Sequence, residues 1–188
     1  MIPSVVSMRK LTHAELIARQ QQQQTRPSQL PFIVVLNNIR SLHNVGSIFR
    51  TCDGVGVEKL WLCGITGYPP DAQLAKTALG AEERVDWEYR ADVCSVLKEL
   101  KAKNYRIVLL EQTTESISYD EFEPSGPVCL VVGNEIEGVA QSIVPLCDAA
   151  IEIEMAGLKN SLNVSVAFGV VAYHFRSCFS RETTVNFS

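Results

Sequence analysis

Short runs of apolar, β-favouring residues alternate with helical patterns through most of this chain, and this alternation restricts the fold more than any other feature. The helical patterns, such as DAQLAKTAL and DVCSVLKELKAKN, place apolar residues three and four positions apart. The apolar runs are FIVVL (32–36), KLWLC (59–63), VDWEY (85–89), YRIVLLE (105–111), PVCLVVG (127–133) and AAIEIEM (149–155). Buried strands that alternate with helices form mainly parallel sheets. We therefore expect an α/β domain with helices on both faces of a mainly parallel sheet.

The 188 residues suit one globular domain preceded by a short extension. In the extension, Thr12 and Glu15 form a capping box that opens a short helix, HAELIARQQQQQ. We place the helical extension at about residues 8–24. The two prolines of TRPSQLP then predict a linker. The predicted division is an extension and linker at residues 1–31, a domain at residues 32–180 and a tail at residues 181–188.

Composition places the chain among cytoplasmic proteins. No apolar run approaches the roughly eighteen residues that cross a bilayer, and the N-terminus lacks the pattern of a secretion signal. The six cysteines show no C-x-x-C pair and no histidine at zinc-finger spacing. We expect them to be buried thiols, with neither a disulfide framework nor a metal site. They are Cys52, Cys63, Cys94, Cys129, Cys147 and Cys178.

Positive charge is concentrated at the start of the chain. Residues 1–50 hold six basic side chains and one acidic side chain, whereas the whole chain has a net charge of −4. This asymmetry predicts a basic arm or face on an acidic body, where a polyanion would dock. A solvated surface helix with incidental charge explains the same pattern, and the sequence alone leaves both interpretations open.

Amides, glycines and charged side chains follow three of the predicted strands. Asn38 and Arg40 follow the first strand, Gly133 and Glu135 follow a later one, and Lys159 follows the last. In parallel sheets the ligand site lies beyond the carboxyl ends of the strands, so we expect these loops to form one site. There is no G-x-G-x-x-G after the first strand, no P-loop and no G-x-S-x-G. A dinucleotide site, a P-loop site and a serine nucleophile elbow are therefore not indicated.

Three ordered motifs in these loops carry a family resemblance. They are N-x-R-x-x-x-N-x-G-x-x-x-R at residues 38–50, G-N-E-x-x-G-V at residues 133–139, and I-x-I-x-M-x-G-x-x-x-S-L-N-V-S at residues 151–165. As a set they resemble the motifs of the SPOUT superfamily of RNA methyltransferases, in its SpoU or TrmH-type branch. The resemblance spans residues 32–178.

The resemblance implies a fold, an activity and partners. We expect the C-terminal segment to be threaded into a deep trefoil knot, and the protein to be a homodimer. We expect it to bind S-adenosylmethionine in the knot and to methylate a ribose 2′-hydroxyl of tRNA or rRNA, with tRNA favoured. Three alternatives stay open: a base-directed RNA methyltransferase, an RNA-binding module without catalysis, and a generic doubly wound nucleotide-binding enzyme.

The resemblance also implies a catalytic group. By this resemblance Arg50 is the catalytic residue, and the residue at this position has been proposed to act as a general base in the family. Because a guanidinium is practically never deprotonated in proteins, we interpret Arg50 as gripping the target phosphate and stabilising the developing 2′-oxyanion, while water takes the proton. Asn44 would orient Arg50, and Asn163 would order the same cluster. The predicted catalytic residues are Arg50, Asn44, Glu135, Ser161 and Asn163.

Binding residues follow from the same similarity. The positions that match cofactor-binding ones are Leu110, Glu111, Gly133, Ile153, Met155, Gly157, Ser161 and Leu162. The RNA-binding candidates, some of them on the N-terminal arm, are Arg9, Lys10, Arg40, Arg50 and Lys159. Ser161 has a second interpretation as the N-cap of the last helix, and the two roles are compatible.

Overall fold

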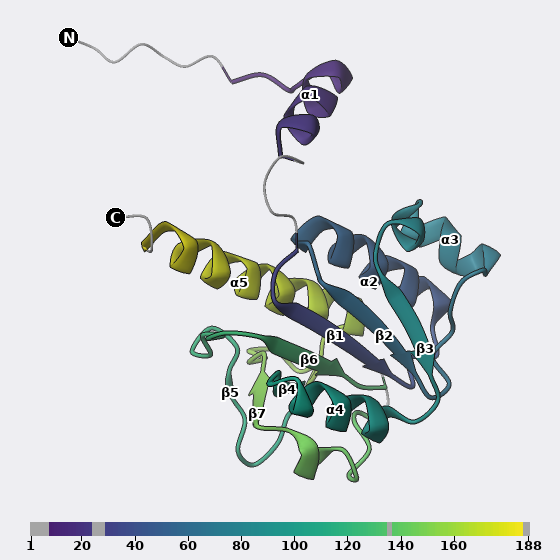
Figure 1. The fold of residues 1–188 in the computed structure, drawn as a ribbon, viewed down its shortest axis with the longest axis vertical. Coiled ribbons are helices and arrows are strands. Elements are labelled where there is room, and N and C mark those ends of the chain that lie inside the picture. The colour runs from purple at the N-terminus through teal and green to yellow at the C-terminus, as the bar shows by residue number, and fades with distance from the viewer. Residues whose placement is uncertain (1–7, 24–28, 135–136, 186–188) are drawn as a thin grey trace.

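The computed structural model describes residues 8–23, 29–134 and 137–185, and its main body is a seven-stranded sheet with helices around it (Figure 1). The strand order is β3-β2-β1-β6-β4-β7-β5, and every neighbouring pair is parallel. The strands are β1 (Phe32–Asn37), β2 (Lys59–Cys63), β3 (Trp87–Arg90), β4 (Arg106–Leu110), β5 (Ile117–Ser118), β6 (Val128–Val132) and β7 (Ala149–Glu152). The helices are α1 (His13–Gln23), α2 (Leu42–Val55), α3 (Ala72–Ala78), α4 (Val93–Ala102) and α5 (Val164–Val185), with short 3-10 turns η1 (Ala81–Glu83) and η2 (Val144–Leu146).

Alternate residues of β1 pack into two separate hydrophobic clusters. Val34 and Leu36 belong to the cluster that includes α2, α3 and α5, whereas Ile33 and Val35 belong to the cluster that includes α4. Side chains of a strand alternate between the two faces of its sheet, so the two clusters mark the two faces. All residues of β1 are buried. The predicted parallel sheet with helices on both faces is confirmed.

Polar caps set the starts of the helices. Ser41 caps α2, Asp71 caps α3 and Asp92 caps α4, each by accepting a backbone N–H in the first turn. The predicted capping box of α1 is confirmed: the Thr12 N–H donates to Glu15 Oε2 at 2.7 Å, and the Glu15 N–H donates to Thr12 Oγ1 at 3.3 Å. Local side-chain chemistry therefore accounts for where these helices begin.

The last helix does not begin where the interpretation of Ser161 as its N-cap would place it. Helix α5 starts at Val164, and Asn163 Oδ1 accepts the Ser165 N–H at 3.0 Å. Asn163 is therefore the N-cap, and the interpretation of Ser161 as the cap is wrong because Ser161 lies in the loop before it. The helix continues to Val185, so the predicted tail begins inside it.

Strand β7 lies between β4 and β5, although it follows both of them in the chain. The two-residue strand β5 was not predicted, because it carries no apolar run of its own. After β7 the chain passes through residues 153–163 into α5, which packs on α2. A trefoil knot requires such an insertion of a late segment between earlier ones, and the knot itself stays a prediction.

Four of the six cysteines are buried as predicted, whereas Cys94 and Cys147 are only partly buried. All six are in the described part of the chain and none is in a disulfide. Burial raises the pKa of Cys63 to about 12 and holds the pKa of Cys129 well above its ordinary value, so both thiols stay protonated at neutral pH. The described residues contain no group of three His, Cys, Asp or Glu side chains placed to hold a metal. None of the described helices is long and apolar enough to cross a membrane.

Candidate functional site

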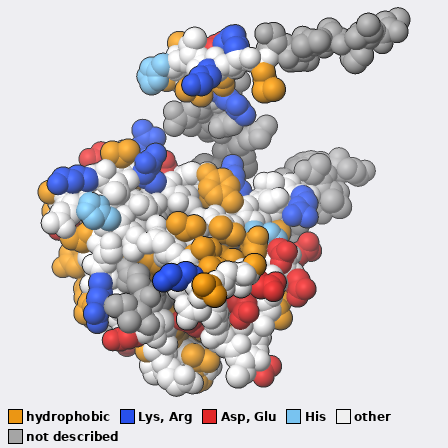
Figure 2. All heavy atoms as spheres, turned by 180° about the vertical axis from the view of Figure 1, so that it is seen from behind, with side chains coloured by type: hydrophobic (Ala, Val, Ile, Leu, Met, Phe, Trp, Pro, Cys, Tyr) orange, Lys and Arg blue, Asp and Glu red, His pale blue; other side chains and the backbone are white. Residues whose placement is uncertain are grey.

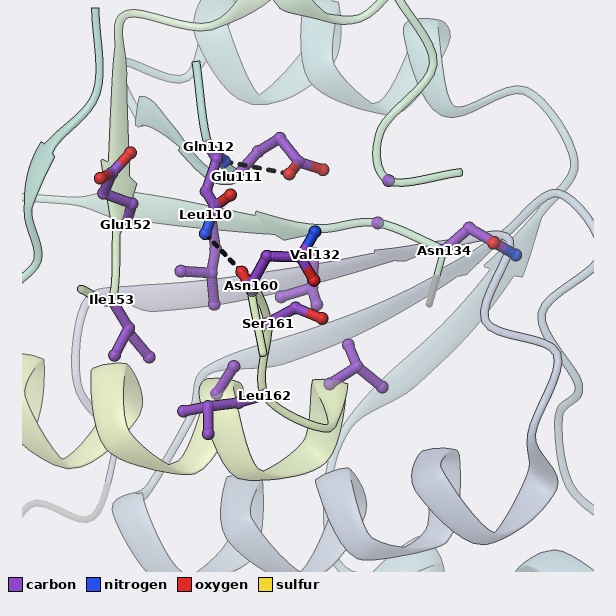
Figure 3. A pocket seen from close by; sticks show the side chains of 14 residues that line it. Leu110, Glu111, Gln112, Val132, Asn134, Glu152, Ile153, Asn160, Ser161 and Leu162 are labelled. Carbon is purple, nitrogen blue, oxygen red and sulfur yellow. Dashed lines mark hydrogen bonds between the residues drawn. The ribbon is translucent and has the colours of Figure 1, made fainter. Parts of the chain in front are cut away.

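A cavity of about 430 Å³ opens at the carboxyl ends of β4, β6 and β7 (Figure 3). Its lining residues are Leu110, Glu111, Gln112, Val132, Gly133, Asn134, Gly138, Glu152, Ile153, Asn160, Ser161, Leu162, Val164 and Ala167. Of the predicted cofactor residues, the cavity brings together Leu110, Glu111, Gly133, Ile153, Ser161 and Leu162. These residues are far apart in the sequence and meet at the edge where parallel sheets bind ligands.

The other two predicted cofactor residues, Met155 and Gly157, line a neighbouring cavity of about 390 Å³. Lys159, an RNA-binding candidate, lines it as well. The residues common to both cavities are Gln112, Glu152, Ile153 and Asn160. All predicted cofactor residues therefore lie in two adjoining hollows at one edge of the sheet.

One wall of the larger cavity contains residues 133, 134 and 137–139 of the loop after β6, and these five described residues we call the braced loop. The predicted catalytic Glu135 in this loop lies outside the described residues. Asn134 and Gly138 exchange two backbone hydrogen bonds of 3.0 Å. Asn134 Nδ2 also donates to the carbonyl of Asn38, in the loop after β1, at 2.8 Å. The braced loop is thereby tied to the first motif.

Close packing holds the braced loop to the end of β4. Glu111 Oε2 accepts the Val139 N–H at 3.1 Å, and Glu111 Oε1 accepts the Gln112 N–H at 3.0 Å. A β-carbon at Gly133 would lie 2.4 Å from Val139 Cγ2, and a β-carbon at Gly138 would lie 2.2 Å from Glu111 Oε2. Gly138 also has φ +65°. Gly133 has no room for a side chain beside the backbone of Gly138 and Val139, and Gly138 favours glycine because of its left-handed backbone.

The opposite wall is the segment between β7 and α5, residues 153–163, which we call the C-terminal loop. Its residues 157–163 are all exposed. Gln112 Nε2 donates to the Asn160 carbonyl at 2.7 Å, as drawn in Figure 3. Within the described chain this is the single hydrogen bond that holds residues 155–162. The two walls of the cavity are therefore secured very differently.

Two predicted catalytic residues meet beside the cavity. Asn163 Nδ2 donates to Asn44 Oδ1 at 3.2 Å, while Asn163 Oδ1 caps α5. Ser161 lies in the cavity wall. Arg50 is exposed on α2 and forms no hydrogen bond or ion pair with another described residue. The structure thus joins Asn44 to Asn163, whereas the orientation of Arg50 by Asn44 stays a prediction.

The predicted RNA-binding cations occupy several places on the surface. On the N-terminal extension, Arg9 forms a 2.6 Å ion pair with Glu15, and this hydrogen-bonded guanidinium lowers the pKa of Glu15 to about 2. Arg40 lies 3.7 Å from Glu137 of the braced loop. The remaining candidates, all exposed, are Lys10, Arg50 and Lys159. Lys159 therefore borders the smaller cavity, and Arg40 lies beside the braced loop.

Apolar side chains are exposed on the C-terminal loop and on α5. Leu158 and Leu162 of the C-terminal loop are exposed, as are Val166 and Tyr173 of α5. On the face of the molecule seen in Figure 2, hydrophobic side chains gather near the middle, with charged side chains around them. Exposed apolar patches of this kind mark interaction surfaces.

Several lining residues were not among the predicted catalytic or binding residues, and their sequence signals differ in strength. Asn134 and Gly138 lie inside the motif G-N-E-x-x-G-V, so the motif itself pointed to them. The sequence signal for Gln112 was only its position, one residue beyond a predicted strand. Asn160 contributes its backbone carbonyl to the contact with Gln112, and a backbone group carries no side-chain signal. The others are Val132, Glu152, Val164 and Ala167.

Comparison with known sequences matches residues 31–173 with the SpoU rRNA Methylase family. A tRNA (guanosine(18)-2′-O)-methyltransferase of Aquifex aeolicus is 37% identical over 145 residues, which are 77% of this chain and 68% of that enzyme. The chain spans about three fifths of the length of several other curated relatives.

Solved structures agree with the match in sequence. The TrmH/SpoU tRNA modifying enzyme of A. aeolicus superposes with a TM-score of 0.78 at 30% identity, covering 89% of this chain and 86% of that one. An AdoMet-bound rRNA methyltransferase from Sinorhizobium meliloti superposes with a TM-score of 0.74 at 25% identity, covering 82% of this chain and 59% of that one.

Proposed function

The chain belongs to the SpoU rRNA methylase family, and from this membership we propose that it transfers a methyl group from S-adenosylmethionine to a ribose 2′-hydroxyl of tRNA or rRNA. The observation that carries the proposal is the cavity at the carboxyl edge of the sheet, where residues of the second and third motifs meet. Asn44 of the first motif reaches the same place through its hydrogen bond with Asn163.

The residues of the larger cavity fit the cofactor. Its volume of about 430 Å³ lies within the range of small-molecule sites, roughly 300–1,000 Å³. Apolar side chains of Leu110, Val132 and Ile153 would take the adenine ring, and exposed backbone of the C-terminal loop would hydrogen-bond its edge. The carboxylates of Glu111 and Glu152 place negative charge near a cationic ligand. S-adenosylmethionine supplies a methyl group on a positively charged sulfur, so the transfer needs little electrophilic help.

The chain's own task is to hold the ribose oxygen in line and relieve it of its proton. Arg50 carries a permanent charge and has no partner among the described residues, so it is available to an RNA phosphate and to a developing oxyanion. Asn44 and Asn163, already hydrogen-bonded to each other, would position the ribose beside it, together with Ser161 and Glu135. Water takes the proton, because a guanidinium does not.

Transfer RNA is the substrate we favour over rRNA. The relative with 37% identity is named as a tRNA enzyme, and the solved structure with 30% identity is described as a tRNA modifying enzyme. Arg40 and Lys159 would contact phosphates next to the cavity, and Arg9 and Lys10 would extend these contacts along the N-terminal arm. Such contacts make the affinity for RNA fall as salt rises.

We also propose a cytoplasmic homodimer that uses the apolar surface of α5 and the C-terminal loop. Val166 and Tyr173 are about half exposed, at 51% and 54%, and burying such surface stabilises association. Light scattering should give twice the chain mass of 20.8 kDa. A Val166→Asp variant should shift toward monomer, and a Leu79→Asp variant, at the exposed C-cap of α3, should not. A wild-type monomer at micromolar concentration would rule out the dimer.

The function is tested by incubating the protein with labelled S-adenosylmethionine and separate pools of unmodified tRNA and rRNA, and by identifying the modified nucleosides by mass spectrometry. We expect a 2′-O-methylnucleoside from the tRNA pool. Arg50→Ala should lower the rate by about 100-fold, the typical cost of removing a group that stabilises an oxyanion. The matched control is Arg84→Ala, since Arg84 is also exposed and lies after η1, away from the cavity.

Each alternative function predicts a different result in this assay. Detection of a nucleoside methylated on a nitrogen or carbon of its base would show that the protein methylates bases and not ribose. Binding of both S-adenosylmethionine and RNA without transfer would favour an RNA-binding module. An Arg50→Ala protein as active as the wild type would remove Arg50 from the catalytic group.

A further inference from the structure

The two residues that follow β4, Glu111 and Gln112, contact opposite walls of the larger cavity. Glu111 accepts the Val139 N–H of the braced loop, and Gln112 donates to the Asn160 carbonyl of the C-terminal loop. Successive side chains of extended backbone point in opposite directions, so neighbouring residues at a strand end can reach both walls. Figure 3 shows both side chains at the end of β4. The two residues that follow β4 therefore contact both walls.

The C-terminal loop depends on this strand more than the braced loop does. The braced loop has further hydrogen bonds through Asn134 and close contacts at Gly133 and Gly138. In the C-terminal loop, residues 155–162 have no described hydrogen bond except the one from Gln112. A segment with few packed neighbours and one exposed hydrogen bond opens at little cost in free energy.

We propose that Gln112 is a positioning residue that holds the C-terminal loop in its binding-competent place through the Asn160 carbonyl, and so sets the affinity for the methyl donor. The inference rests on the proposed function, since it concerns the same cavity. Without the Gln112 donor, the loop would occupy this place in a smaller fraction of molecules. The apparent dissociation constant rises in inverse proportion to that fraction.

The test is calorimetric titration of the full chain with S-adenosylmethionine in the absence of RNA. Gln112→Ala removes the side chain beyond its β-carbon, and Gln112→Glu keeps its shape but replaces the donating amide with an acceptor. Both variants should weaken binding about 3- to 10-fold, as expected for one hydrogen bond. The control is Gln73→Glu, an exposed glutamine on α3 that is remote from the cavity.

A second measurement does not need the cofactor. Amide hydrogen exchange in the ligand-free protein should be faster in the peptide that covers residues 157–162 in both Gln112 variants, and unchanged in the braced loop. The melting temperature should match that of the wild type, which separates positioning of the loop from a general loss of stability.

The outcomes separate this inference from the function. If the wild type binds S-adenosylmethionine and both variants bind equally well, Gln112 has no positioning role. If Gln112→Glu behaves like the wild type and Gln112→Ala does not, side-chain bulk matters and the hydrogen bond does not, which also overturns the inference. If the wild type binds no S-adenosylmethionine, the proposed function fails, and this inference fails with it.

Discussion

The braced loop and the C-terminal loop face the same cavity, but one is held from several sides and the other by a single contact. In the braced loop, Asn134 and Gly138 pair through their backbones and Glu111 accepts the Val139 N–H. In the C-terminal loop, Gln112 alone donates to residues 155–162 within the described chain. The described residues of the two walls therefore differ in how many hydrogen bonds hold them.

The largest effect should come from filling the space at Gly133. A β-carbon there would lie 2.7 Å from two backbone atoms of the braced loop, besides its contact with Val139 Cγ2 at 2.4 Å. Gly133→Ala should therefore lower the free energy of unfolding by about 3 kcal/mol, as overpacking of a closely packed site does. Urea denaturation measures this change.

The matched control for Gly133 lies in the opposite wall. A β-carbon at Gly157 meets nothing within 4 Å, so Gly157→Ala should leave the midpoint of urea denaturation within error of the wild type. Equal effects of the two substitutions would show that the walls do not differ in rigidity.

An intermediate effect is expected at Asn134, which is 7% exposed. Asn134→Asp keeps the oxygen that accepts the Glu137 N–H but places an oxygen against the Asn38 carbonyl, where Nδ2 now donates at 2.8 Å. Losing a buried donor should cost about 2 kcal/mol in the free energy of unfolding. The same change at the exposed Asn160 should cost almost nothing, because its side chain has no described partner. A costly Asn160→Asp would contradict the comparison.

The smallest effect should appear where the C-terminal loop joins α5. Asn163→Ala removes the N-cap of α5 and should cost about 1 kcal/mol in the free energy of unfolding. Combining it with Asn44→Ala in a double-mutant cycle should give a coupling energy of about 0.5 kcal/mol, because the two amides are hydrogen-bonded at 3.2 Å. Strict additivity of the two substitutions would mean that this hydrogen bond does not form in solution.

Much of the fold could be predicted because its signals are local. The runs FIVVL and VCLVV read as strands buried on both sides, and they form the neighbouring strands β1 and β6. Strand β5 could not be predicted, because a two-residue strand has no periodicity of its own and exists through pairing with β7. The N-cap of α5 was misplaced in the interpretation of Ser161 because Ser161 and Asn163 are both good caps, and only the path of the loop decides between them.

By itself, the sequence determined the strand and helix elements. It also placed amides, glycines and an arginine at the carboxyl ends of strands. The elements and these loop residues could be read from the sequence because they depend on residue types at close spacing. Tertiary structure alone decided that β7 lies between β4 and β5, and that Gln112 meets the carbonyl of Asn160. Hydrogen bonds between distant segments form only once the chain has folded, and the backbone groups that accept them are the same in every residue. The unequal support of the two cavity walls is therefore visible only in the folded protein.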